Sequence, residues 1–239
     1  MQATRISRRS LTAALVAIAL FGLQPATGAD ETSPMDRSGG EYLAAFARDY
    51  GPRVLLTGSL FAWGLLAPDQ LGTGTIEIPP GDPVELNEAI DRAGTVAAVL
   101  AMGTSTAGRV VSDWPNAMDE ISRSAAVIAS AYATRSYLKA VFRRTRPSAA
   151  ADGPVTVDDA QSFPSGHTLL AFACVGDALV GAMRRQVEPW VLASVTIEAI
   201  AVAALRVGAG AHYPGDVVAG AAIGLAVGSV VSLLILPRG

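Results

Sequence analysis

Residues 217–236 read VVAGAAIGLAVGSVVSLLIL, an uncharged stretch that is apolar almost throughout. A bilayer core needs about 20 apolar residues in a crossing helix, and this stretch meets that length. Gly220, Gly224 and Gly228 recur at four-residue spacing and therefore fall on one helical face, where they allow another backbone to approach closely. The stretch predicts a closely packed terminal helix of membrane-spanning length.

Proline and glycine residues divide the rest of the chain into further helical segments. The pattern predicts an all-α fold, a bundle of about six helices, with only a weak strand signal at 75–78. Asp177 and Glu198 interrupt two apolar segments. Because charge is costly against lipid, we expect them either to face the bundle interior or to mark these helices as soluble ones. The expected helices cover about 42–66, 83–109, 115–142, 167–185, 189–207 and 214–236.

Composition excludes several classes of protein. The 239 residues are 51% hydrophobic and only 16% charged, which excludes a disordered chain. A net charge of -3 lacks the basic excess of a nucleic-acid binder, so we expect no nucleic-acid partner. The single cysteine, Cys174, can form no intrachain disulfide and fits no zinc-binding spacing, so we expect a small buried apolar side chain.

The first 29 residues have the pattern of a secretory signal. Arg5, Arg8 and Arg9 precede an apolar run at 11–23, and small residues follow at 26–29. This predicts export with cleavage after Ala29, leaving 30–239 as a single helical domain with its motif-bearing core at about 85–236. An uncleaved membrane anchor is the alternative.

The distribution of arginines favours one orientation if the bundle lies in a membrane. Suppose that the chain starts from an exported N-terminus and crosses the membrane five times, near 93–108, 120–138, 168–183, 190–205 and 217–236. Then Arg109, the Arg184–Arg185 pair and Arg238 lie on the cytoplasmic side. This agrees with the positive-inside rule. An unusually apolar soluble bundle in the periplasm is the alternative.

Three rare residues mark three short motifs. Lys139 is the only lysine, and His167 and His212 are the only histidines. The first motif runs from Lys139 to Arg146 and Pro147, and its seven-residue spacing predicts two cations on one helical face, suited to an oxyanion such as phosphate. Taken alone, the first motif is explained as well by a basic helix C-terminus that complements the helix dipole, and we expect the intervening arginines at 143 and 144 to be ordinary charges of this kind.

The second motif places an anion site at the start of a helix. In the run SFPSGH, at 162–167, Ser165 is suited to an N-cap position. The backbone amides of Gly166 and His167 are then free to bind an anion, and Gly166 has no Cβ to obstruct the approach. An ordinary Ser-Gly turn before a helix is the alternative.

The third motif joins an arginine, a histidine and an aspartate. Gly208 and Gly210 lie between Arg206 and His212 and predict a break in the helix, so that the chain turns back. Asp216 then falls in the first turn of the next helix, where it can accept a hydrogen bond from the imidazole and fix its tautomer. An acidic helix cap beside an ordinary histidine is the alternative.

Together, the patterns Lys-x6-Arg-Pro, Pro-Ser-Gly-His and Arg-x5-His-x3-Asp resemble the signature of the type-2 phosphatidic acid phosphatase superfamily. This superfamily also contains bacterial acid phosphatases and vanadium haloperoxidases. The resemblance implies that His212 attacks phosphorus, Asp216 orients it and His167 protonates the leaving oxygen. It implies no cofactor and no metal. Leu205 stands where the family usually has serine, which removes one phosphate hydrogen bond. The implied phosphate-binding residues are Lys139, Arg146, Ser165, Gly166 and Arg206.

The expected activity is metal-independent hydrolysis of a phosphomonoester or pyrophosphate, most readily of a lipid, through a phosphohistidine. We expect membrane association in the cell envelope, with the site facing the periplasm. The polar segment 148–163, which contains Asp152, Asp158 and Asp159, is expected to border the site. A vanadate-dependent haloperoxidase and a non-catalytic envelope protein that binds phosphorylated lipid are the alternatives.

Overall fold

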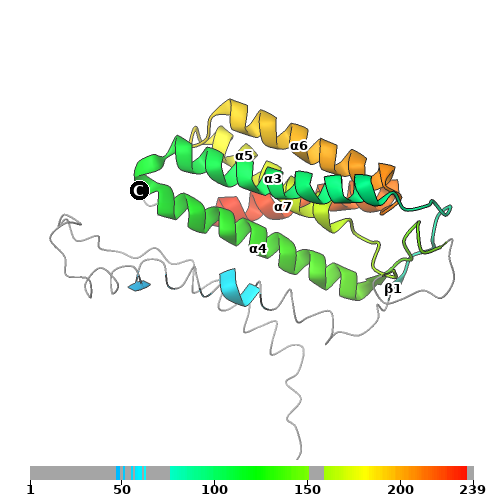
Figure 1. Ribbon diagram of the computed structural model, residues 1–239. Coiled ribbons are helices and arrows are strands. Elements are labelled where there is room, and N and C mark those ends of the chain that lie inside the picture. Colours follow the sequence, from blue (N-terminus) through cyan, green and yellow to red (C-terminus); the bar gives the residue numbers. More distant parts are fainter. Residues whose placement is uncertain are drawn as a thin grey trace, which may run out of the picture.

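The computed structural model describes residues 76–150 and 159–235, with a few isolated positions between 47 and 62. Within these residues the fold is all-α, as predicted, and its helices run alongside one another in Figure 1. The expected signal at 1–29 lies outside the described residues, and the expected helix at 42–66 is described only at isolated positions. The long helices are α3 (Glu88–Ser112), α4 (Ala117–Val141), α5 (Gly166–Met183), α6 (Pro189–Gly208) and α7 (Pro214–Leu234), and the short 3-10 helix η2 (Trp114–Asn116) precedes α4.

The helix boundaries follow the capping and breaking residues of the sequence. Asn87 caps α3, since its side-chain oxygen accepts a hydrogen bond from the backbone N–H of Ile90 at 3.2 Å. Pro189 and Pro214 begin α6 and α7, where a proline loses no intrahelical hydrogen bond. The chain reverses after α6 through Gly210, whose φ of 70° is a conformation that glycine adopts at little cost.

Helix α4 ends one residue before the predicted boundary at 142, so the first motif leaves the helix soon after Lys139. It stops at Val141, and Phe142–Arg143 form strand β2, which pairs in parallel with β1 (Ile76–Glu77). The ring of Phe142 also meets that of Phe163 edge-on, with centroids 5.1 Å apart. The prediction that Lys139 and Arg146 share a helical face is therefore wrong, because the strand and its aromatic contact turn the chain out of the helix. The weak strand signal at 75–78 does mark a strand.

Helix α5 lies at the centre of the bundle and packs against all four of the other long helices. Its contact with α7 is the close glycine seam that the sequence predicts. A Cβ at Gly220 would lie 2.7 Å from the carbonyl oxygen of Ser165, and Cβ atoms at Gly224 and Gly228 would overlap the carbonyls of Leu169 and Ala173. Since real side chains do not approach backbone so closely, this seam requires glycine.

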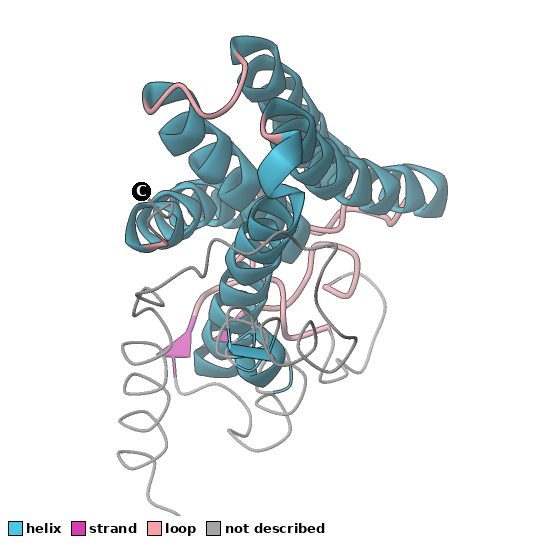
Figure 2. Ribbon diagram, turned by 90° about the vertical axis from the view of Figure 1, so that its left-hand side faces the viewer, coloured by secondary structure: helices cyan, strands magenta, loops and turns pink. Residues whose placement is uncertain are grey.

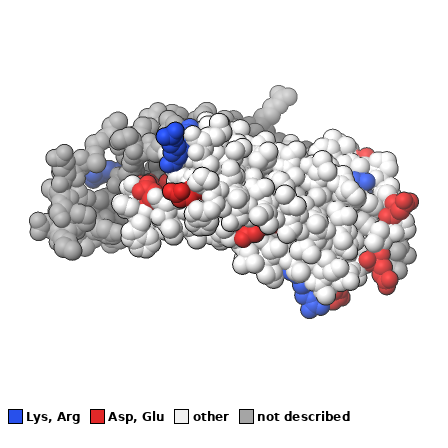
Figure 3. Space-filling view, turned by 90° about the horizontal axis from the view of Figure 1, so that it is seen from above, with Lys and Arg blue, Asp and Glu red and all other residues white. Residues whose placement is uncertain are grey.

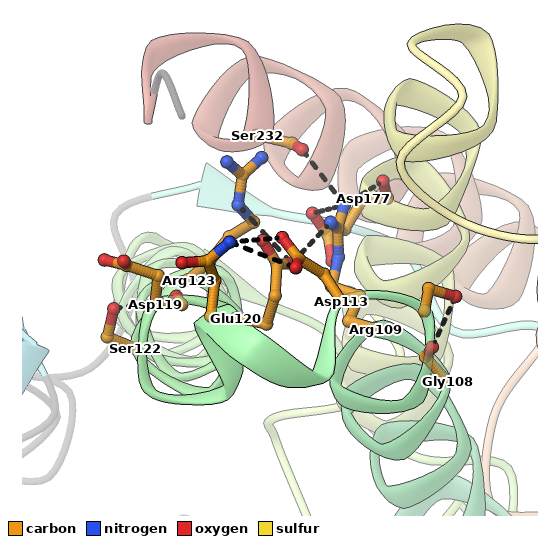
Figure 4. A network of polar contacts seen from close by, with 11 residues as sticks. Gly108, Arg109, Asp113, Asp119, Glu120, Ser122, Arg123, Asp177 and Ser232 are labelled. Carbon is orange, nitrogen blue, oxygen red and sulfur yellow. Dashed lines mark hydrogen bonds and ion pairs between the residues drawn. The ribbon is translucent and has the colours of Figure 1, made fainter. Parts of the chain in front are cut away.

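A buried ionic cluster ties four helices together at one end of the bundle (Figure 4). The guanidinium of Arg109 binds both carboxylate oxygens of Asp177, at 2.5 and 2.6 Å, and reaches Glu120 at 2.9 Å. It also lies 3.5 Å from the hydroxyl of Ser232 on α7. Asp177 thus faces the interior, as predicted, and the half-buried Glu198 accepts a hydrogen bond from Thr104 at 2.9 Å.

Three helices among the described residues, α5, α6 and α7, are long and apolar enough to cross a membrane. Only 28% of the apolar window of α6, and the same share of α7, is buried inside the protein. The face that α6 covers has few charged side chains along its middle (Figure 3). Cys174 is buried, as expected. The bundle therefore carries an apolar outer surface as well as an apolar core.

The helix ends fall into two groups at opposite ends of the bundle. Figure 2 looks roughly along the helices, from one of these ends. One group contains the starts of α3, α5 and α7 with the ends of α4 and α6, beside the β1–β2 pair. We call this the β1 end. The other group contains η2, the α5–α6 turn and the cluster of Arg109. All three sequence motifs lie at the β1 end.

Candidate active site

Lys139 lies in the last turn of α4, and its ammonium is buried. It donates a hydrogen bond to the carbonyl oxygen of Gln161 at 2.8 Å, which anchors it beside the second motif. Burial, and then the nearby charges of Arg146, Arg135 and Arg206, hold the pKa of this ammonium well below its usual 10.5. An anion placed among these cations would offset their mutual repulsion.

Arg146 follows strand β2 in the chain and lies near Lys139 and His212. Its backbone N–H donates to the carbonyl oxygen of Asp159 at 2.8 Å, so one residue of the polar segment expected to border the site does so through its backbone. Its guanidinium lies 3.4 Å from the carbonyl oxygen of Ala211, the residue before His212. Asp152 and Asp158 lie outside the described residues.

The second motif forms the N-terminus of α5. Ser165 is the N-cap, as predicted, although its hydroxyl lies 3.0 Å from that of Thr168 and makes no capping hydrogen bond. Its backbone N–H donates to the carbonyl oxygen of Asp216 at 3.0 Å, which joins the second motif to the third. The first amides of a helix have no intrahelical partner, so those of Gly166 and His167 point toward any anion bound here.

Arg135, one turn before Lys139 on α4, covers the start of α5. A Cβ at Gly166 would lie 2.8 Å from the Cδ of Arg135 and would overlap its Nε, so the missing side chain makes room for this arginine. The half-buried His167 is acted on by the charges of Arg206, Arg135 and Lys139. Arg135 therefore adds a further cation beside His167.

Arg206, near the end of α6, is buried and turned toward α3. Its guanidinium forms an ion pair with Asp91, with Nη1 2.8 Å from Oδ1, and also donates to the carbonyl oxygen of Asp91 at 3.2 Å. Leu205, at the position where serine was expected, packs near Gly94, where an added Cβ would lie 3.4 Å from the Leu205 Cβ. A carboxylate thus lies beside an arginine implied to bind phosphate.

His212 and Asp216 are both buried and lie close to each other. The Nδ1 atom of His212 is 3.9 Å from Oδ2 of Asp216, which is longer than a hydrogen bond. Burial, helped by the charges of Arg146 and Lys139, lowers the pKa of His212 from 6.5 to about 3, and this outweighs the effect of Asp216. The imidazole is therefore neutral at neutral pH, which leaves one ring nitrogen free to act as a nucleophile.

Asp216 is also the helix cap that the sequence offered as an alternative. Its Oδ2 accepts from the backbone N–H of Tyr213, the N-cap of α7, at 3.1 Å, and from the hydroxyl of Ser162 at 2.6 Å. Its Oδ1 accepts from Arg144 at 2.7 Å. The expectation that Arg144 is an ordinary charge at a helix C-terminus is wrong, because the helix ends before it and its side chain pairs with Asp216.

The structure brings all the predicted site residues to the β1 end, and adds four that the motifs did not indicate. Arg135 could have been found from its position four residues before Lys139, on the same helical face. Asp91, Arg144 and Ser162 could not, because their partners lie far away in the chain. Among the described residues, no three His, Cys, Asp or Glu side chains gather as metal ligands.

The arrangement has the parts that transfer of a phosphoryl group requires. A neutral imidazole lies beside a buried carboxylate, and a second imidazole lies near cations that also act on the first. Ammonium and guanidinium groups stabilise charge on phosphoryl oxygens, and backbone amides at a helix N-terminus add to this.

Comparison with known protein families agrees with this chemistry. A family model described as the PAP2 superfamily matches residues 121–238, which extend from α4 to beyond α7 and include all three motifs. No curated protein and no solved structure shows significant similarity to the chain. The family match implies phosphatase-type activity on phosphoesters. Through the region 121–238, the chain belongs to the PAP2 superfamily.

Proposed function

We propose that the protein is a metal-independent phosphatase that hydrolyses a phosphomonoester or the end of a pyrophosphate, carried by a lipid, through a phosphohistidine. The observation that supports this most strongly is that Lys139, Arg206 and His167 lie at the same end of the bundle as the buried pair of His212 and Asp216, whose Nδ1 and Oδ2 atoms are 3.9 Å apart. One tetrahedral anion placed among these groups would meet a nucleophile, an acid and the cations that balance its charge.

In the first step, Nε2 of His212 attacks phosphorus. The N–P bond forms while the bond from phosphorus to the leaving oxygen breaks, and that oxygen takes a proton from His167. Lys139, Arg146 and Arg206 stabilise the charge on the equatorial oxygens. In the second step, water gives a proton to His167 and attacks phosphorus, which breaks the N–P bond and releases inorganic phosphate.

A lipid is the preferred carrier because the outer surface of the bundle is apolar. Large apolar side chains are exposed along three helices, such as Val99 on α3, Ile197 on α6 and Val218 on α7, which are 59%, 68% and 68% exposed. Exposed apolar surface of this extent suits a bilayer better than water. A site at the β1 end would then lie at the level of lipid headgroups.

The orientation that we propose places this site on the exported side of the membrane. Arg184 and Arg185 follow α5 at the opposite end of the bundle, where positive charge favours the cytoplasm. Trp114 and Trp190 lie at the same end and are 71% and 54% exposed, which suits the membrane interface. The arginine pair supports export of the β1 end, and the tryptophans support a membrane interface at the opposite end.

Phosphate release by the purified, detergent-solubilised protein tests the proposal. Lipid phosphates, lipid pyrophosphates and soluble phosphoesters would be compared, each with and without EDTA. We expect release from lipid substrates that EDTA does not affect, and loss of turnover in His212→Ala. Gly103→Ala, at an exposed position on α3 with open space around it, is the control for handling and folding.

Two results would contradict the proposal. Full activity of His212→Ala would exclude the phosphohistidine, and a strong loss with EDTA would indicate a different chemistry. Binding of phosphorylated lipid without release would instead indicate the non-catalytic alternative, and halide oxidation that depends on added vanadate would indicate the haloperoxidase.

A further inference from the structure

We infer that the hydroxyl of Ser162 carries the contact between His212 and Asp216, and that Arg144 holds the carboxylate in place for it. Both are positioning residues, since each acts through the carboxylate of Asp216. The inference rests on the proposed function in one respect, the role of His212 as the nucleophile.

The distances place the Ser162 hydroxyl between the two groups. Its Oγ lies 2.6 Å from Oδ2 of Asp216 and 3.5 Å from Nδ1 of His212, whereas those two atoms are 3.9 Å apart. A hydroxyl donates one hydrogen bond and accepts others. Because the carboxylate of Asp216 can only accept, Ser162 donates to it and is left to accept from Nδ1–H of His212.

Other donors prevent the carboxylate from turning toward the imidazole. Oδ2 is held by the backbone N–H of Tyr213 at 3.1 Å, and Oδ1 by Arg144 at 2.7 Å. The guanidinium of Arg144 is itself fixed, because it lies over the ring of Tyr213 with its Cζ 4.2 Å from the centroid. Rotation of Asp216 toward His212 would break these bonds at a carboxylate that is fully buried.

Arg144 and Ser162 are fixed to each other through the backbone. The backbone N–H of Ser162 donates to the carbonyl oxygen of Arg144 at 2.9 Å. The backbone N–H of Arg144 donates in turn to the carbonyl oxygen of Ala160, also at 2.9 Å. These backbone hydrogen bonds join the first motif to the second, and they place the side chains of Arg144 and Ser162 at the carboxylate of Asp216. This explains why residues 18 positions apart act on Asp216 together.

The chemical consequence concerns the tautomer of His212. A proton held on Nδ1 by Ser162 leaves the lone pair on Nε2, the atom that attacks phosphorus. When the N–P bond forms, the imidazole keeps its Nδ1 proton and becomes positively charged, and the Asp216 carboxylate stabilises this charge through the hydroxyl. No proton passes along Ser162, and the 3.5 Å contact is expected to shorten as the charge develops, as catalytic contacts do in substrate complexes.

Nitrogen NMR of the full-length protein, labelled with ¹⁵N-histidine, tests the tautomer directly. The chain has only two histidines, so His167→Gln leaves the signals of His212 alone. We expect a protonated Nδ1 and an unprotonated Nε2 for His212, and a loss of this preference in Ser162→Ala. Ser124→Ala is the matched control, because it removes another buried serine hydroxyl, on α4, that has no hydrogen-bond partner in the described part of the chain.

Kinetics give the second measurement. Loss of a hydrogen bond to a developing charge lowers kcat by about 10- to 100-fold, and we expect this in Ser162→Ala with little change in KM. Arg144→Gln is expected to lower kcat similarly, and Arg144→Lys to restore part of it. If Ser162→Ala does not fold, Ser162→Cys keeps the volume with a weaker hydrogen bond and is expected to lower kcat less.

An unchanged tautomer and kcat in folded Ser162→Ala would overturn the inference, because the hydroxyl would then not set the tautomer of His212. If the alanine variant does not fold, the same result in folded Ser162→Cys would overturn it. The NMR measurement needs no substrate. If the wild-type protein releases no phosphate, but Ser162→Ala still loses the preference for a protonated Nδ1, the result contradicts the proposed function and supports the role of Ser162.

Discussion

Arg206 on α6 and Asp91 on α3 form an ion pair, with Nη1 2.8 Å from Oδ1, between residues 115 positions apart in the chain. The carboxylate competes with any anion for the same guanidinium. Asp91→Asn keeps the backbone carbonyl that also anchors Arg206 but removes the negative charge. Two unit charges about 4 Å apart in water interact by about 1 kcal/mol, so inhibition by inorganic phosphate should strengthen by about fivefold or more.

The control for this variant is Glu88→Gln. It removes one carboxylate from the same first turn of α3, where Glu88 pairs with the exposed Arg92 rather than with a site residue. Inhibition constants for phosphate, measured for both variants, separate the local effect from a general change in charge. Equal or weaker inhibition of Asp91→Asn relative to wild type would show that Arg206 does not bind the phosphate.

The pKa of His212 sets the acid limit of activity. Burial lowers this pKa from 6.5 to about 3, so the neutral, nucleophilic form persists as the pH falls through 6 and 5. Carbon or nitrogen NMR of His212, with His167 replaced by glutamine, should show no protonation between pH 7 and about pH 4. A titration near pH 6.5 would mean that the imidazole is solvated rather than buried.

The local elements could be predicted from the sequence because local chemistry sets them. Pro189 and Pro214 can begin a helix but cannot continue one, and the four-residue glycine spacing defines the face of α7 that meets α5. The shared helical face of Lys139 and Arg146 was predicted incorrectly, because Phe142 joins a strand whose partner, at 76–77, gives only a weak signal.

The candidate site was predictable only in part, for the same reason. The motifs identify side chains by residue type and spacing, and the structure does bring them together at one end of the bundle. Ser162, Arg144 and Asp91 act through partners 54, 72 and 115 positions away, which no local pattern reports. Asp216 also serves both as helix cap and as neighbour of His212, two roles that the sequence presented as alternatives.

The glycine seam between α5 and α7 gives a prediction about stability. In Gly228→Ala the new methyl group would overlap the carbonyl of Ala173, and such overpacking costs about 1–3 kcal/mol in the free energy of unfolding. Gly103→Ala, in the exposed part of α3, should instead stabilise by about 1 kcal/mol because alanine favours helix over glycine. Unfolding in detergent compares the two, and equal effects would contradict the close packing.

The ionic cluster of Arg109 should be important for folding and unimportant for catalysis. Asp177→Asn leaves the buried guanidinium without its main counter-charge, and breaking such a pair costs about 3–5 kcal/mol. Replacing both residues, in Arg109→Met with Asp177→Leu, should cost less than Asp177→Asn, because no guanidinium is left without its counter-charge and Glu120 keeps Arg123 at 3.9 Å. The folded fraction of each variant should keep the wild-type kcat, and a lower kcat would mean that the cluster acts on the site.

Trapping of the phosphorylated protein tests the central claim most directly. His167→Gln, given a substrate whose leaving group needs no proton and whose phosphate is labelled, should form the N–P bond but hydrolyse it slowly, because no base activates water. After an alkaline quench, peptide mass spectrometry should find one phosphoryl group per chain, on His212. A label on a serine hydroxyl such as that of Ser162 or Ser165, or no label while phosphate is released, would contradict the account.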